Sequence, residues 1–393
     1  MIVTVSRRRF LQGLGAIAAS AAAERWLDAQ ALAPVPGGRL VRTMPLGRLD
    51  GRPRPPFHQL LDISLDARQF TDLSQLDADH LVTPTPQFYI RTAHPPALPS
   101  ANGWTIALGG RIAAPGTLDI PTLERDARDM GVRLLECAGN ADPANFGLMS
   151  AAQWAGVPMA AVLDRATPLA GATRIRITGV DDETTPTATS NPGASWIFTR
   201  DELERTGAFL ALRMNGAALT LDHGAPVRLV VPNYYGCSCI KWVSRIDWVP
   251  DDEPAPIQML EFSTRTHQKA VFRLARDYEP PVIDLAATPV RVEQWVTTEG
   301  GRERVRYRVV GVRWGGQQRT APLSIRFRRD AAAAPVSDCP PSDNTGTWSL
   351  WTHAWTPDAP GRYQIALGVT DPSIRARRLA TGYYTRDVDI DRV

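Results

Sequence analysis

Polar and apolar residues alternate along the last third of the chain. The segments RVRYRVVGVRW, LSIRFRRD and RYQIALGVTD each follow this pattern, and clusters of Gly, Pro, Asp and Asn separate them. A period of two residues is typical of strands that bury one face. Residues 283–393 are therefore predicted to form a β-sandwich of Ig-like size. Trp348, Trp351 and Trp355 could belong to its core or to a contact surface, and the usual burial of tryptophan favours the core.

Residues 59–255 mix two periodicities. The segments 105–108 and 174–178 alternate as strands do, whereas 121–131 reads as a helix with a proline near its start and a glycine past its end. The stretch 199–202 (TRDE) has the spacing of a capping box, which predicts that another helix begins there. This block is predicted to be an α+β domain with many irregular connections.

The N-terminus has the pattern of an export signal. Residues 6–12 (SRRRFLQ) precede LGAIAASAAA, a short apolar segment rich in alanine. This pattern resembles a twin-arginine signal over residues 1–30, which would place the mature protein in the periplasm. A basic N-terminus that merely seeks a surface is the alternative.

Two further segments are rich in proline. Residues 31–58 are predicted to be a Pro/Gly-rich arm that lies extended over the surface, and residues 256–282 are predicted to be a linker between the two domains.

Length and charge narrow the class of protein. The chain has 393 residues, of which 44% are hydrophobic, so it can bury a sizeable core and form two or three domains. Its 44 basic and 41 acidic residues leave a net charge of only +3, which argues against nucleic acid as a partner. Apart from the signal, no segment approaches the roughly 20 apolar residues of a membrane span.

The four cysteines are sparse for a disulfide framework. Cys237 and Cys239 are two residues apart, which on a strand separates them by about 6 to 7 Å, at or beyond the comfortable limit for a bridge. Zinc is not favoured either, because the six histidines are scattered. Cys137 and Cys339 are the other two cysteines.

Cys137 is the cysteine with the most informative surroundings. It ends an apolar run in LLECAGN and is followed by Ala138, Gly139 and Asn140. Small residues at such a position let the backbone approach a bulky ligand closely. A buried structural cysteine is the alternative, and this motif alone does not decide between the two.

Several motifs together resemble the sulfite oxidase family of molybdopterin enzymes, and they occur in the same order as in that family. They are FYIRTAHPPALP at 88–99, LLECAGN at 134–140, GLMSAAQWAGVPMAAVL at 147–163 and MNGAALTLDHGAPVRLVVPNYYGCSCIKWVSRI at 214–246, followed by the C-terminal sandwich. The resemblance implies a mixed α+β molybdopterin-binding domain with a sulfite oxidase-like fold and a C-terminal Ig-like domain through which relatives dimerise. A homodimer is therefore expected.

The resemblance implies a molybdenum centre at which Cys137 is the protein ligand. A soft thiolate suits a metal that is already bound by the dithiolene sulfurs of one pterin. Such a centre transfers an oxygen atom to or from a small molecule with two electrons, and the protein positions and tunes it.

The pterin carries a phosphate, so a cradle of positive and donor groups is expected. The resemblance assigns to it His223, Arg228, Ser238, Lys241 and His94, and places Arg91 nearer to the metal. Arg228 could hold phosphate with two hydrogen bonds, whereas Lys241 would act as a point charge. As isolated residues, both could equally be solvated surface residues. His94 stands in RTAHPP, where many relatives place the histidine next to an asparagine.

Two departures from the family concern the substrate. Sulfite-oxidising relatives continue CAGN with two arginines, whereas this chain continues with Ala141 and Asp142. A carboxylate there would repel an anionic substrate by a few kcal/mol at about 4 Å. Pro192 stands near the position at which sulfite oxidases have a tyrosine that faces the substrate. A neutral or organic substrate, or reduction of a sulfoxide, is therefore expected, and Trp154 and Trp196 would line its pocket unless they are core residues.

Electrons must leave through a partner. The chain lacks the HPGG signature of a fused haem domain and any CxxCH haem attachment, so a separate carrier such as a periplasmic c-type cytochrome is expected. The competing hypothesis is a cofactor-free binding protein that keeps the scaffold without its chemistry.

Overall fold

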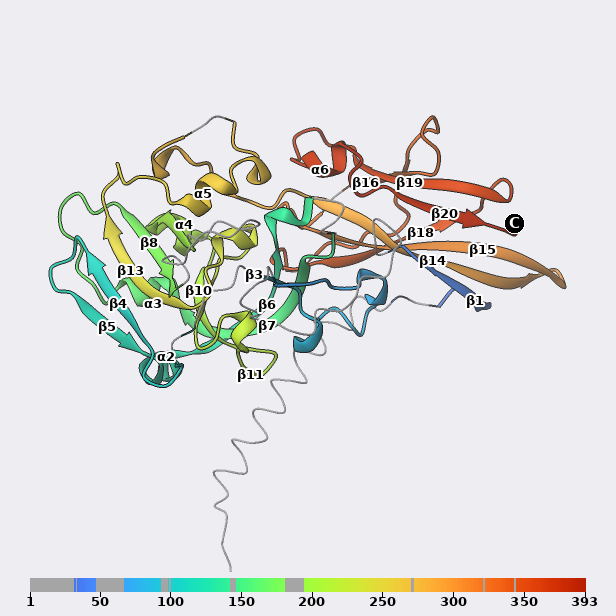
Figure 1. The fold of residues 1–393 in the computed structure, drawn as a ribbon. Helices are drawn as coiled ribbons and strands as arrows, with labels where there is room; N and C mark the ends of the chain where they lie inside the picture. Colours follow the sequence, from blue (N-terminus) through green and yellow to red (C-terminus); the bar gives the residue numbers. More distant parts are fainter. Residues whose placement is uncertain are drawn as a thin grey trace, which may run out of the picture.

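The computed structural model describes most of the chain. The described residues are 34–46, 67–92, 100–141, 146–180, 194–269, 272–320, 322–342 and 344–393, together with residues 32 and 98. The export signal predicted over 1–30 lies outside them, as do residues 47–58 of the arm. Two groups of sheets lie side by side, one built largely from residues 105–249 and the other from 286–390 (Figure 1).

A five-stranded sheet forms one part of the first group, with the order β5-β4-β13-β8-β9. Its neighbours are antiparallel except for β4 and β13, which run parallel. The strands are β4 (Thr105–Gly110), β5 (Gly116–Asp119), β8 (Arg174–Gly179), β9 (Ser195–Thr199) and β13 (Val243–Val249). The strands predicted at 105–108 and 174–178 are thereby confirmed.

A second five-stranded sheet follows the order β11-β10-β7-β6, with β12 also paired to β10. Its strands are β6 (Arg128–Glu136), β7 (Met149–Pro158), β10 (Phe209–Met214), β11 (Ala217–Ala218) and β12 (Arg228–Val230). A short antiparallel pair of β2 (Ala67–Gln69) and β3 (Ile90–Thr92) lies beside these sheets. β6 and β3 matter for function because they carry the segments of Cys137 and Arg91.

Short helices connect these strands. The α-helices are α2 (Ile120–Asp126), α3 (Met159–Leu163), α4 (Arg200–Arg205) and α5 (Ile257–Glu261). The 3-10 helices are η1 (Leu73–Gln75), η2 (Thr85–Gln87), η3 (Ala138–Ala141), η6 (Leu221–His223), η7 (Gly236–Ser238), η8 (Thr264–Thr266) and η9 (Ala275–Asp277). The predicted linker at 256–282 therefore contains three of these helices.

Local sequence patterns predicted the start of one helix correctly and the end of another helix wrongly. The capping box at α4 is confirmed, because Glu202 N donates to Thr199 Oγ1 at 3.1 Å and Thr199 N donates to Glu202 Oε2 at 2.7 Å. The helix predicted over 121–131 ends at Asp126, which corrects that prediction. Gly131 is not its C-terminal cap: it lies in β6 at a bulge with φ of 74°. Pairing with β7 draws these residues into the sheet and overrides the helical pattern.

The C-terminal part contains two antiparallel four-stranded sheets, with the orders β1-β14-β15-β18 and β17-β16-β19-β20. Their strands are β14 (Ala286–Glu299), β15 (Arg302–Trp314), β16 (Leu323–Arg326), β17 (Ala334–Pro335), β18 (Ser349–Trp355), β19 (Gly361–Val369) and β20 (Arg386–Ile390), and α6 (Arg377–Ala380) precedes β20. The chain thus combines an α+β part with a β domain, whose Ig-like character stays a prediction. The described residues include no helix long and apolar enough to cross a membrane.

The first strand of this β domain comes from the N-terminal arm. β1 (Gly38–Pro45) pairs antiparallel with β14, from Gly38 opposite Thr297 to Pro45 opposite Arg291. In Figure 1, β1 lies beside β14 although most of the chain separates them. The sequence predicted only an extended arm, because a register shift between Leu40 and Arg42 interrupts the two-residue period.

The tryptophans of β18 and the segment before it are core residues, as predicted. Trp348, Trp351 and Trp355 are 1%, 0% and 8% exposed. Trp351 lies opposite Gly311 of β15, where a Cβ atom would come within 2.0 Å of the indole ring. The glycine therefore makes room for the ring.

Replacing Gly311 with alanine should lower the free energy of unfolding by about 1–3 kcal/mol, because the added methyl group overpacks the core. Urea unfolding would measure the change. Gly116→Ala in β5 is the matched control, since no heavy atom of the described residues, its two chain neighbours aside, lies within 4 Å of its Cβ position. Equal stabilities of the two variants would contradict this packing argument.

Candidate active site

A tight turn fixes Cys137 immediately after β6. Its backbone N donates to Leu148 O at 2.9 Å, and its carbonyl accepts from Asn140 N at 2.9 Å. The sulfur accepts a hydrogen bond from Gly139 N at 3.3 Å, and the residue is 6% exposed. The predicted position at a strand end is confirmed, and η3 holds the thiol in one orientation.

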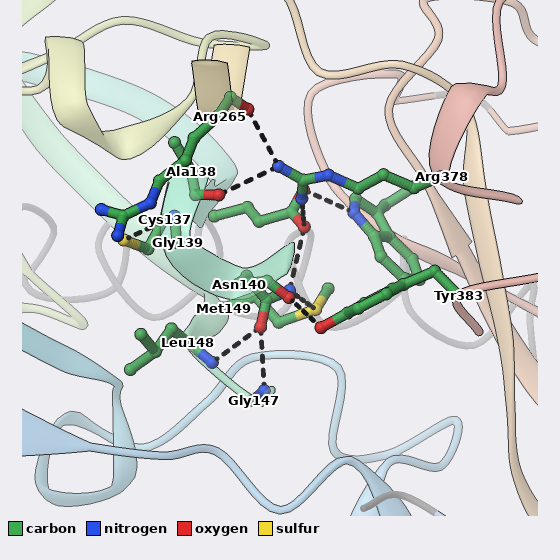
Figure 2. A network of polar contacts seen from close by, with 12 residues as sticks. Cys137, Ala138, Gly139, Asn140, Gly147, Leu148, Met149, Arg265, Arg378 and Tyr383 are labelled. Atoms are coloured by element: carbon green, nitrogen blue, oxygen red, sulfur yellow. Dashed lines mark hydrogen bonds and ion pairs between the residues drawn. The ribbon is translucent and has the colours of Figure 1, made fainter. Parts of the chain in front are cut away.

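Asn140 closes this turn from within. Its Oδ1 accepts from Gly147 N at 2.9 Å and from Leu148 N at 3.1 Å, and its Nδ2 donates to Glu136 Oε1 at 2.9 Å. The side chain is fully buried. Every polar atom of its amide group therefore binds a group of the turn or of the adjoining strands, as a buried amide requires (Figure 2).

A buried ion pair ties the turn to the β domain. Glu136 is fully buried, and its Oε1 accepts from Arg378 Nη1 at 3.1 Å while its Oε2 accepts from Trp314 Nε1 at 2.8 Å. Arg378 Nη2 also donates to Ala138 O at 3.0 Å. Residues of α6 and β15 thus bind the carboxylate at the end of β6, the strand that leads to the thiol.

Two further contacts complete this connection. The guanidinium of Arg378 lies 4.6 Å from the ring centre of Tyr235, and Tyr383 Oη donates to Asn140 O at 2.7 Å. Figure 2 shows Arg378 and Tyr383 approaching the turn from the same side. The β domain therefore determines where the backbone around Cys137 can lie.

Positive charge surrounds the thiol. Burial raises the pKa of Cys137, and the nearby charges of Arg91, Arg265 and Arg378 act against this rise. In Figure 2 the side chain of Arg265 extends toward the Cys137 turn. The protein alone thus favours the neutral thiol, and binding of a metal would deprotonate it.

A second group of basic residues lies around β12. Arg228 is 4% exposed, and it donates to His223 O at 3.2 Å and to Cys239 O at 3.3 Å. Its Nε has no hydrogen-bond partner among the described residues. Lys241 Nζ donates to Thr92 Oγ1. A buried guanidinium that binds only neutral carbonyl groups in the described part of the chain is costly unless an anion joins it.

His223 is neutral in this cluster. Burial first, and then the positive charges of Lys241 and Arg228, lower its pKa to about 3. Its Nε2 lies 3.3 Å from Thr85 O. It lies beside the buried Arg228, whose guanidinium donates to two carbonyl groups among the described residues, and this arrangement fits a cradle for the phosphate of the pterin.

Gly224 allows the cluster to form. It ends η6 with φ of 100°, and a Cβ atom there would lie 2.9 Å from Arg228 Cβ and 3.2 Å from Lys241 Cβ. A residue with a side chain would be strained and would push these two basic residues away. The turn after His223 can therefore pack directly against both of them.

The three remaining predicted site residues are Arg91, Ser238 and His94. Arg91 lies on β3 and its charge acts on Cys137. Ser238 is fully buried and its Oγ donates to Tyr235 O at 2.9 Å, so its hydroxyl holds η7. His94 lies outside the described residues.

Cys137, Cys237 and Cys239 are buried thiols, and Cys339 is partly buried. Cys237 and Cys239 are not on a strand, because η7 places them around a tight turn. Trp154 and Trp196 are buried to 0% and 1% exposure, in agreement with core positions. Trp154 also lies 5.8 Å from the guanidinium carbon of Arg228, so it packs beside the cradle.

Sequence reasoning missed Glu136, Arg265 and Arg378. Glu136 precedes the cysteine, and a buried carboxylate at the end of an apolar run is a signal that a cationic partner exists. Nothing in the sequence indicated that this partner is Arg378. Arg265 lies in the segment that was predicted to be a linker, and no local pattern marked it.

Removing Arg378 should destabilise the protein strongly. Arg378→Met leaves the carboxylate of Glu136 buried without its cation, and we expect a loss of about 3–5 kcal/mol in the free energy of unfolding. The double variant E136Q/R378M should recover part of that loss, because no uncompensated charge remains. Denaturant unfolding of both proteins would measure this, and a double variant no more stable than R378M would contradict it.

The neutral state of His223 predicts a pH dependence of stability in the cofactor-free protein. The pKa of this histidine is about 3 in the folded state, well below the ordinary value in the unfolded state. The unfolded state therefore takes up a proton first, and stability falls as the pH falls below about 6.5, by at most about 1.4 kcal/mol per pH unit. His223→Gln should flatten this slope in urea unfolding between about pH 4.5 and 7. An identical slope in both proteins would contradict the assignment.

The chain is similar to known molybdenum enzymes. Residues 93–257 match a family model described as oxidoreductase molybdopterin binding domain. Over 196 residues the chain is 31% identical to mitochondrial sulfite oxidase of Macaca fascicularis, with 45% of this chain and 35% of that protein covered. Over 331 residues it is 25% identical to sulfite oxidase of Gallus gallus, with 76% and 69% covered. Over 196 residues it is 28% identical to NADH nitrate reductase of Cichorium intybus, with 44% and 20% covered.

The matches thus span about a third of the macaque protein and a fifth of the nitrate reductase. A solved structure, the sulfane dehydrogenase SoxCD from Paracoccus pantotrophus, shares the fold with a TM-score of 0.61 at 16% identity, covering 86% of this chain and 90% of that chain. Together with the basic cradle, these similarities confirm the expected cofactor. Residues 93–257 thus form an oxidoreductase molybdopterin binding domain, and together with the similar sulfite oxidases and nitrate reductases this domain implies a molybdenum-molybdopterin cofactor.

Proposed function

We propose that the protein catalyses two-electron oxygen-atom transfer at a molybdenum centre to which Cys137 contributes the protein thiolate. The observation that carries this proposal is the placement of one thiol, oriented by η3, among the charges of Arg91, Arg265 and Arg378. The bound cofactor would supply the oxygen-atom and electron chemistry.

The residues around Cys137 would orient the ligand. Hydrogen bonds from Gly139 N to the sulfur and from Asn140 N to the Cys137 carbonyl restrict the side chain to one direction. The ion pair between Glu136 and Arg378 holds the backbone on either side of it. A side chain that is already held in its metal-binding orientation loses little conformational entropy when it binds the metal.

The cradle of His223, Arg228 and Lys241 would bind the phosphate of the pterin. Arg228 can offer its Nε, which has no hydrogen-bond partner in the part of the chain that the structure describes, and Lys241 adds a second positive charge. The one N–H of the neutral imidazole of His223 donates to Thr85 O, so His223 would shape the cradle without adding charge. Arg228 and Lys241 would supply the donors to the anion.

The remaining features of the enzyme are also part of the proposal. The twin-arginine pattern supports export to the periplasm, and the absence of a haem attachment motif from the sequence supports a separate electron carrier, such as a c-type cytochrome. We infer that the β domain is Ig-like and mediates dimerisation. The relatives are named for sulfite and for nitrate, which are both small oxyanions. The alternative of a cofactor-free binding protein gains no support from these similarities.

Metal analysis of Cys137→Ser tests the proposal. Expressed in a host that makes the cofactor, the wild-type protein should hold about one molybdenum atom per chain, and the variant should lose oxygen-transfer activity while it still folds. Metal analysis, pterin fluorescence and thermal unfolding would measure these effects, and Cys339→Ser is the control for loss of a thiol elsewhere. Full activity of C137S would refute the ligand assignment, and wild-type protein without metal or pterin would favour the binding protein.

A further inference from the structure

A cavity of about 510 Å³ lies in the β domain, outside the site described above. Its lining comes from β16 and β19, from Ala333, and from the segment 371–382, which includes α6. In Figure 1, α6 lies at one end of β16 and β19. Small-molecule sites in proteins typically have volumes of about 300–1,000 Å³. The cavity therefore has the size of a ligand site.

Small residues on one face of the β16–β19 pair leave this space. Ser324 lies opposite Gly368 in the register of the two strands. Two residues further along β16, Arg326 lies opposite Ala366. Alternate residues of a strand point to the same face, so these four share the face that lines the cavity. Ile325 points to the other face and is 1% exposed. Only Arg326 has a long side chain on the cavity face, and the space beside α6 stays open.

Aliphatic residues supply the apolar part of the lining. They come from β19, from the turn before α6 and from α6 itself, and they are Leu367, Val369, Ile374 and Leu379. No aromatic residue is among the lining residues that the structure describes. A ligand with a compact aliphatic body would remove apolar surface from water against these side chains.

Positive charge exceeds negative charge in the lining. Arg326, Arg375 and Arg377 line the cavity, whereas the one carboxylate in the described lining is that of Asp371. Asp371 Oδ1 accepts from Ser373 N at 2.9 Å and from Ser373 Oγ at 2.7 Å, so this carboxylate holds its own turn. The excess of cations favours an anionic ligand.

The three arginines differ in their partners. Arg377 donates to Asp284 from Nε at 2.6 Å and from Nη2 at 3.0 Å, and Arg375 Nε lies 3.9 Å from the same carboxylate. The side chain of Arg326 is exposed and has no hydrogen bond or ion pair with any residue that the structure describes. Arg326 is therefore the cation that a ligand can bind without displacing a described partner.

The helix that lines the cavity also holds the turn of the thiol. α6 contributes Leu379 and Ala380 to the lining. The residue before them, Arg378, donates to Glu136 Oε1 at 3.1 Å and to Ala138 O at 3.0 Å. A ligand in the cavity would thus contact the helix on which the position of the active-site turn depends.

We propose that this cavity is a second ligand site, which binds a small carboxylate with an aliphatic body through the guanidinium of Arg326. The planar guanidinium matches the two oxygens of a carboxylate, and such charge-assisted bonds are among the strongest in proteins. The aliphatic lining binds the body of the ligand. The inference is independent of the proposed molybdenum chemistry, because no residue of that chemistry lines the cavity.

Calorimetric titration of the molybdenum-loaded enzyme with cyclohexanecarboxylate tests this inference. The wild-type protein should bind it, and Arg326→Met should weaken binding by roughly 10-fold to 100-fold, as expected for a lost charged hydrogen bond. Arg326→Lys should lie between the two, because lysine keeps the charge without the fork. Cyclohexanecarboxamide, which has the same shape without the charge, should bind the wild-type protein as weakly as the carboxylate binds R326M. Arg329→Met is the control, since Arg329 is an exposed arginine that does not line the cavity.

Hydrogen exchange provides a second measurement, which locates the ligand. Ala380 N donates to Ala376 O at 2.8 Å and Thr381 N donates to Arg377 O at 3.1 Å, so both amides report the opening of α6. Saturating cyclohexanecarboxylate should slow their exchange, because a ligand that binds the folded state opposes local opening. Ala366→Leu should remove both the binding and this protection by filling the cavity. If A366L does not fold, the comparison of R326M with R329M decides.

Several results would overturn the inference. They are a wild-type protein that does not bind cyclohexanecarboxylate, equal binding of the carboxylate by the wild-type protein and R326M, and binding that leaves the exchange of the α6 amides unchanged. Equal affinity for the carboxylate and the carboxamide would overturn the anionic class of the ligand. A wild-type protein that binds the carboxylate but carries no molybdenum would support this site and count against the proposed function alone.

Discussion

The buried ion pair between Glu136 and Arg378 is the constraint on which the site depends. The carboxylate ends the strand that leads to Cys137, and the guanidinium comes from α6 of the β domain. A pair this deeply buried is costly unless its remaining hydrogen bonds are satisfied, and here Trp314, Asn140 and Ala138 supply them. The two groups of sheets are therefore joined at the point where the geometry of a metal ligand must be set.

Two kinds of positive charge follow from this arrangement, and they differ in solvent access. Arg228 is buried with the neutral His223, where only a permanently bound anion can compensate it. Arg265 is exposed, and its charge acts on Cys137. Burial therefore makes Arg228 far more costly than Arg265 to leave without an anion.

Much of this organisation could be read from the sequence, but the contacts between distant segments could not. The thiol at a strand end, the capping box of α4 and the tryptophan core of the β domain follow from local patterns. The partner of Glu136 lies 242 residues away and has no signal of its own. The end of α2 was misplaced because pairing with β7 outweighs helical propensity beyond Asp126.

The pairing of β1 with β14 has a consequence for how the chain acquires its final form. The strand at Gly38–Pro45 can find its partner only after residues 291–297 have been made, so the beginning of the protein stays unpaired during most of its synthesis. From then until β1 pairs with it, β14 presents one open row of backbone donors and acceptors, which is a template for self-association. A leader placed before β1 would therefore be attached to a strand that cannot join its sheet before β14 has been made.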